Sequence, residues 1–174
     1  NPVVMLEHKG LYWSKVPGTL EAKTVEPDEN YIIPLGKANI LVKADVSAIE
    51  THQSALIISY GMGIYWSKEA ARNFPGRIEI LDLRTLNPID WELISASVRI
   101  HGRVLIVTEE PILNSFAESL AGRISQYHFE WLDAPVMTIG AANLPAIPLN
   151  SDLEKQMLPN AEKVAARLAD LLRY

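Results

Sequence analysis

The 174-residue sequence contains no cysteine. Disulfide frameworks, thiolate zinc sites, iron–sulfur ligation and cysteine nucleophiles are therefore excluded for this chain. The absence of cysteine is also consistent with a reducing compartment.

Long apolar runs and an excess of positive charge are absent as well. No apolar run approaches the roughly 18 residues that a membrane span requires. The 16 Lys and Arg residues face 21 Asp and Glu, so the net charge is −5. This charge repels nucleic acid and anionic lipid but attracts a basic protein surface. We therefore expect a basic protein partner, and neither a nucleic acid nor a membrane.

The motifs that usually carry enzyme chemistry are missing too. The sequence has no Gly-x-Ser-x-Gly elbow, no phosphate-binding lysine loop, no Gly-Asp-Gly motif and no His-Glu-x-x-His. Its four histidines are scattered, and His101, at the end of a predicted helix, is interpreted as a helix-end cation. Of the adjacent Glu109 and Glu110, we expect one carboxylate to be solvated and the other to cap the following turn. The residues alone thus predict no catalytic, cofactor-binding or metal-binding side chain.

Regular structure is predicted from about residue 37 onward. Apolar runs that are typical of strands occur at 39–42, 55–58, 78–83, 104–107 and 135–139. Helical patterns separate the last four runs, which favours an α/β fold with a mostly parallel sheet covered on both faces. Only residues 44–53, which show no helical pattern, join the first two runs. We therefore expect these two strands to pair antiparallel at an edge of a mixed sheet.

Two of the predicted helices have clear start signals. Ser115 followed by Glu118 forms a capping box before a helix that carries apolar residues at every fourth position. Asn160 after Pro159 starts the last helix, whose apolar face should pack on the outside of the sheet.

The first 36 residues follow a different pattern. Residues 3–8 form a short apolar run that suits a buried strand, but no earlier sequence supplies a pairing partner. Residues 14–36 lack apolar periodicity and contain several prolines, which indicates a linker or surface arm. We interpret the chain as a piece of a longer protein.

One glycine pattern offers an alternative function. Gly61 and Gly63 follow a predicted strand and open a helix, and Asp82 ends the next strand. This copies part of the fingerprint of dinucleotide-binding domains, in which glycines let a pyrophosphate approach a helix N-terminus. Trp66 stands where the third glycine would be expected. A plain tight turn and a free-standing nucleotide-binding enzyme domain both remain possible interpretations.

Several strings together resemble a known family. They occur at residues 2–9 (PVVMLEHK), 33–38 (IPLGKA), 80–90 (ILDLRTLNPID), 102–103 (GR), 107–110 (VTEE), 132–135 (LDAP) and 158–159 (LP). Their order and spacing are similar to those of the beta subunit of the thiamine-dependent first component of 2-oxoacid dehydrogenase complexes, of pyruvate or branched-chain type. The C-terminal domain of transketolase or of deoxyxylulose-phosphate synthase shares the fold, but it fits residues 33–38 less well.

This resemblance implies a domain plan and a fold. Residues 1–13 would be the last strand of a preceding pyrimidine-binding domain, residues 14–36 a linker or arm, and residues 37–174 a transketolase C-terminal-like domain. The implied fold is a three-layer α/β/α sandwich around a five-stranded mixed, mostly parallel sheet.

The resemblance also implies a function for the parent enzyme. That enzyme would decarboxylate a 2-oxoacid and reductively acylate a lipoyl group, in the bacterial cytoplasm or the mitochondrial matrix. Thiamine diphosphate and magnesium would bind to other domains, so this fragment would bind no cofactor and would be inactive alone.

The family further implies where partners bind. The domain would help to assemble the subunits, and an acidic face would receive the basic subunit-binding domain of the acyltransferase core. Asp133 matches the acidic contact of the family in the string LDAP, and Glu130 and the carboxylate of the terminal Tyr174 are further candidates.

Overall fold

The computed structural model describes residues 2, 4–145 and 147–174. The chain divides into two units, Asn1–Ile33 and Pro34–Tyr174, which are described separately. Within the described residues, no helix combines the length and the apolar character that crossing a bilayer needs.

The first unit contains little regular structure. It has one short helix, α1 (Lys9–Tyr12), and one 3-10 turn, η1 (Leu20–Ala22). The strand expected over residues 3–8 is not formed: residues 4–8 have no regular structure, and the side chains at 4–6 are exposed, while Val3 lies outside the described residues. A strand needs hydrogen-bonding neighbours, and this unit provides none in its described part. The assignment of residues 1–13 to a preceding domain and of 14–36 to a linker stays a prediction.

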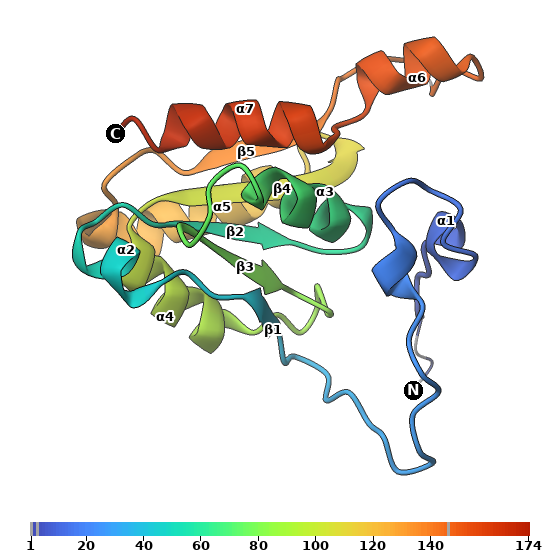
Figure 1. The fold of residues 1–174 in the computed structure, drawn as a ribbon, viewed down its shortest axis with the longest axis horizontal. Helices are drawn as coiled ribbons and strands as arrows, with labels where there is room; N and C mark the ends of the chain where they lie inside the picture. Colours follow the sequence, from blue (N-terminus) through green and yellow to red (C-terminus); the bar gives the residue numbers. More distant parts are fainter. Residues whose placement is uncertain (1, 3, 146) are drawn as a thin grey trace. The chain divides into compact units, whose positions relative to one another are not determined.

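The second unit is built on a five-stranded mixed sheet, as predicted (Figure 1). The strands lie in the order β1-β3-β2-β4-β5, and only β1 runs antiparallel to its neighbour. Their bounds are β1 (Asn39–Val42), β2 (Ala55–Ser59), β3 (Ile78–Asp82), β4 (Val104–Pro111) and β5 (Met137–Ala141).

Helices cover both faces of this sheet and complete the three layers (Figure 1). Alternate residues of each central strand point to opposite faces, so Ile57 packs with α3 and α7, whereas Ile58 packs with α4 and α5. The bounds of the four helices are α3 (Met62–Ala71), α4 (Trp91–His101), α5 (Phe116–His128) and α7 (Ala161–Leu171). β2 is buried throughout, and β3 and β4 are buried except at their C-terminal ends, because both faces of these strands are covered.

The helix caps explain where three of these helices begin. Ser115 Oγ accepts a hydrogen bond from the Glu118 N–H at 3.0 Å, and Asn160 Oδ1 accepts one from the Lys163 N–H at 2.8 Å, as the sequence predicts. The buried carboxylate of Asp90 accepts the Leu93 N–H at the start of α4 and also the Ala38 N–H before β1. Asp90 therefore links the start of α4 to the edge strand.

Two predictions for the segment before β2 are wrong. Residues 44–53, expected to be non-helical, contain a short helix, α2 (Val46–Glu50). The edge strand β1 is antiparallel, but it pairs with β3 and not with β2. The connection is long enough to pass β3, and apolar runs do not specify which neighbour a strand takes.

The end of the chain contributes one further helix, α6 (Ser151–Met157), which projects beyond the sandwich in Figure 1. The Lys163 ammonium group donates to the carbonyl oxygens of Lys155, Gln156 and Leu158 at 2.6–3.0 Å. A cation at these carbonyls satisfies acceptors that the helix leaves open, and it thereby connects α6 to α7.

Candidate functional site

Asp133 lies in the connection between the 3-10 turn η2 (Phe129–Trp131) and β5. Its backbone N–H donates a 2.8 Å hydrogen bond to the carbonyl of Gly102, which ends α4 and lies two residues before β4. Its side chain is exposed. The backbone of the predicted docking residue is therefore fixed beside the N-terminal ends of the parallel strands.

Gly102 makes room for this carboxylate. It ends α4 in the left-handed conformation, with a φ of 64°, and its N–H donates to the Val98 carbonyl. A Cβ at this position would lie 2.6 Å from Asp133 Oδ2. Glycine thus allows both the helix end and the close approach of the carboxylate.

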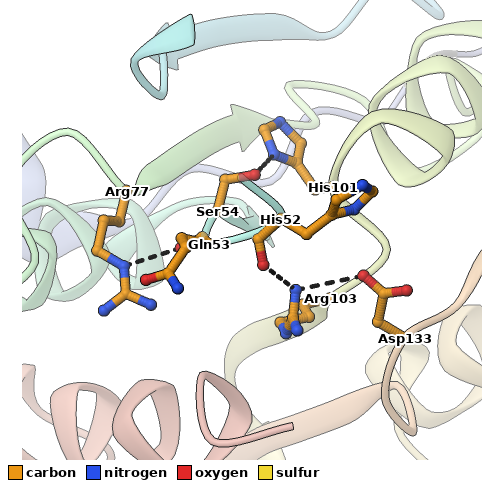
Figure 2. A network of polar contacts seen from close by, with 7 residues as sticks. All are labelled: His52, Gln53, Ser54, Arg77, His101, Arg103 and Asp133. Atoms are coloured by element: carbon orange, nitrogen blue, oxygen red, sulfur yellow. Dashed lines mark hydrogen bonds and ion pairs between the residues drawn. The ribbon is translucent and has the colours of Figure 1, made fainter. Parts of the chain in front are cut away.

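Arg103 connects Asp133 to a neighbouring turn, as Figure 2 shows. Its Nη1 donates to Asp133 Oδ2 at 3.2 Å and to the carbonyl oxygen of His52 at 2.7 Å. His52 has a positive φ of 53°, and Arg77 Nε donates to the next carbonyl, that of Gln53, at 2.8 Å. Two guanidinium groups therefore hold the turn that leads into β2.

Behind this turn lies a buried polar chain. Ser54 Oγ lies 2.8 Å from His101 Nδ1, and His101 Nε2 lies 3.4 Å from Glu79 Oε1. Ser97 donates to the same Glu79 oxygen at 2.6 Å. Burial opposes ionisation of Glu79, but the neighbouring His101 and the Ser97 hydroxyl outweigh it and lower the pKa of this carboxyl below its ordinary value.

The structure places His101 in the last turn of a helix, as the sequence predicts, and adds contacts that the sequence does not show. The ring belongs to the last turn of α4 and is buried against Glu79 of β3 and Ser54. The sequence does not show this pairing, because the residues at 54, 79 and 101 come together only when the sheet is assembled.

The other two predicted docking residues are exposed and make few contacts. Glu130, in η2, accepts a hydrogen bond from the Trp131 indole at 3.0 Å. Tyr174 follows α7, and the chain end lies at the same end of the sheet as α2 (Figure 1). Within the described residues, no hydrogen bond or ion pair joins Asp133, Glu130 and Tyr174 to one another.

The two glycines of the alternative nucleotide site lie where β2 ends and α3 begins, and they have different structural roles. A Cβ on Gly63 would lie 2.3 Å from Ser59 Oγ and 3.1 Å from the Val107 carbonyl, so this glycine lets α3 approach β2 and β4 closely. Gly61 has a positive φ of 56°, which the turn from β2 into α3 requires. Asp82 accepts the Arg84 N–H at 3.1 Å, and burial raises the pKa of its carboxyl.

Glu110 does not cap the following turn, and a cap by Glu109 stays a prediction. Glu110 Oε1 lies 3.3 Å from the Tyr60 hydroxyl and 3.3 Å from Thr108 Oγ1. Glu118 accepts the Asn114 N–H in that turn. Burial raises the pKa of the Tyr60 hydroxyl, and the negative charge of Glu110 adds to this effect.

No cluster of three or more His, Asp or Glu side chains with the geometry of a metal site occurs among the described residues. The sequence assigned no role to Arg103, which makes the central contact of the network in Figure 2. A basic residue after a helix-ending glycine is too common a pattern to single it out.

Comparison with known proteins places this geometry in a family. The family described as "Transketolase, C-terminal domain" matches residues 44–164. The pyruvate dehydrogenase E1 component subunit beta of Rhizobium meliloti is 32% identical over 94% of this chain and 33% of its own length. The 2-oxoisovalerate dehydrogenase subunit beta of Bacillus subtilis is 29% identical over 100% of this chain and 50% of its own length. The chain thus spans a third to a half of these relatives.

A solved structure agrees on the fold. A split-gene transketolase, described as an inactive beta4 tetramer, superposes with a TM-score of 0.67 at 19% identity over 84% of this chain and 45% of that one. Together with the family match and the five-stranded sheet, this similarity confirms the predicted fold, and the chain belongs to the transketolase C-terminal domain family.

Proposed function

We propose that the chain is the structural, subunit-assembling and partner-docking domain of a thiamine diphosphate-dependent 2-oxoacid dehydrogenase, and that it is not catalytic alone. The parent enzyme would oxidatively decarboxylate pyruvate or a branched-chain 2-oxoacid and pass the acyl group to lipoyl groups. Similarity to beta subunits of both types along nearly the whole chain supports this proposal.

In this proposal, thiamine diphosphate and magnesium belong to other domains or subunits of the parent enzyme. Two observations support a cofactor site outside this domain. The glycines that resemble a nucleotide fingerprint are accounted for by the turn and by helix packing. The relatives are also two to three times longer than the part that this chain matches. The parent would work in the bacterial cytoplasm or the mitochondrial matrix, and one relative from Caenorhabditis elegans is named as mitochondrial.

The proposed partners are the other subunits of the dehydrogenase and the basic subunit-binding domain of its acyltransferase. The proposal that this domain docks a partner rests on the position of Asp133. Its carboxylate is exposed, and it is held by the backbone of Gly102 and the side chain of Arg103. The net charge of −5 adds a long-range attraction for a basic domain. Glu130 and the Tyr174 carboxylate would contribute further contacts.

Titration calorimetry with that basic domain tests the docking site. Asp133→Ala should weaken binding severalfold, because the partner's cation then loses its counter-charge. Asp152→Ala is the matched control, since it removes an equally negative, exposed side chain on α6 that pairs only loosely with Lys155 at 3.9 Å. Thermal unfolding should show that both variants fold.

Two outcomes would remove Asp133 from the site. Unchanged affinity in Asp133→Ala would show that the carboxylate is not a contact. Equal losses in both variants would show that only the net charge matters.

A further inference from the structure

We propose that Arg103 is a positioning residue for docking: it holds the Asp133 carboxylate in the orientation in which a basic partner binds it. This inference rests on the proposed function, because it assumes that Asp133 is the docking carboxylate. Figure 2 shows the contacts that carry it.

The ion pair is asymmetric, with a largely buried cation and a half-exposed anion. The Arg103 side chain is 11% exposed, whereas that of Asp133 is 41% exposed. Arg103 binds one carboxylate oxygen, Oδ2, and none of the described residues is a hydrogen-bond or ion-pair partner of Oδ1. One oxygen is therefore held by the domain while the other is available to a second cation.

Arg103 is itself held in place. The same Nη1 atom donates to the His52 carbonyl at 2.7 Å, and the residue lies between Gly102 and the fully buried start of β4. A guanidinium that has a fixed acceptor on one side can orient a carboxylate on the other.

Holding the carboxylate before the partner arrives should strengthen docking. An exposed aspartate that moves freely loses rotamer freedom when it is bound, and a pre-oriented one has already lost it. The Asp133 backbone is also fixed, through its bond to the Gly102 carbonyl, so both ends of the residue are constrained.

Charge alone predicts the opposite effect of removing Arg103. A cation beside the site repels a basic partner, so Arg103→Met should tighten binding if only the field matters. If positioning matters more, the same variant should bind more weakly. The sign of the change therefore separates the two explanations.

The experiment titrates the chain with the acyltransferase's subunit-binding domain at about 0.15 M salt, where the Debye length is roughly 8 Å. The variants are Arg103→Met, Arg103→Lys, Asp133→Asn and the Met/Asn double variant. We expect Arg103→Met to weaken binding severalfold, Arg103→Lys to restore part of the loss, and Arg103→Met to have no further effect in the Asp133→Asn background.

A second variant tests the same idea without changing any charge. Gly102→Ala places a methyl group 2.6 Å from Asp133 Oδ2 and should displace the carboxylate. It should therefore weaken binding in the native background but not when Asp133→Asn is present. This variant keeps the proposal testable if Arg103→Met does not fold.

The outcomes separate two failures. If Asp133→Asn binds the subunit-binding domain normally, Asp133 is not the docking carboxylate, and the positioning role of Arg103 is also refuted. If Asp133→Asn weakens binding while Arg103→Met binds as tightly as the native chain or more tightly, Asp133 is the docking carboxylate but Arg103 does not position it. An equal loss from Arg103→Met with and without Asp133 would also overturn it, because Arg103 would then act through the His52 turn alone.

Discussion

The substitution Gly63→Ala tests whether a glycine is needed for the packing of α3 on the sheet. The added methyl group would lie 2.3 Å from Ser59 Oγ and 3.1 Å from the Val107 carbonyl, the two atoms joined by a 2.8 Å hydrogen bond. Overpacking of this kind costs about 1–3 kcal/mol, and loss of the buried hydrogen bond costs about 0.5–1.5 kcal/mol. The helix gains at most about 1 kcal/mol from alanine. We expect the free energy of unfolding to fall by about 0.5–4.5 kcal/mol.

Gly122→Ala is the matched control, because Gly122 lies within α5 and a Cβ there would meet no atom within 4 Å. The same change should raise the free energy of unfolding by up to about 1 kcal/mol. Equilibrium unfolding in urea at constant m-value measures both variants. The reasoning is refuted if Gly63→Ala is neutral or stabilising, or if both variants shift in the same direction. Ser59→Ala should partly rescue Gly63→Ala, because it removes the nearest atom.

Two further predictions concern buried carboxylates. The lowered pKa of Glu79 means that its contribution to stability is complete above its unfolded value of about 4.5 and is lost as the pH falls through the folded value. Glu79→Gln should therefore flatten the decline in unfolding free energy below pH 4.5, and an unchanged acid profile would contradict this. Asp90→Ala should cost about 1–3 kcal/mol, because it removes the cap of α4 and leaves the Ala38 N–H without its acceptor. Asp90→Asn should retain most of the cap, and equal urea midpoints for the two variants would count against this role.

Local signals in the sequence were sufficient for most of the sandwich. The strands at 55–58 and 104–107 were recognised because residues buried on both faces are almost all apolar, and α5 because Ser115 and Glu118 mark its start. The short helices α2 and α6 were not predicted, since five and seven residues are too few for a periodic apolar pattern.

Local signals in the sequence do not predict contacts between distant segments. The partner of β1, the burial of His101 against Glu79 and the contact of Arg103 with Asp133 each join residues 20 to 50 positions apart in the sequence. Such contacts depend on the order of strands in the sheet, which apolar runs do not encode. Asp133 is singled out only by the family resemblance of the string LDAP, and its role in docking stays a prediction.

The central claim is that this domain supplies a scaffold and a docking surface, while the cofactor binds elsewhere in the parent enzyme. Thermal unfolding of the chain with thiamine diphosphate and magnesium, NAD or ATP tests it most directly. We predict no shift with any of them. Stabilisation by about 2.7 kcal/mol at 100 times a dissociation constant, which saturating binding to the folded state would produce, would contradict the account.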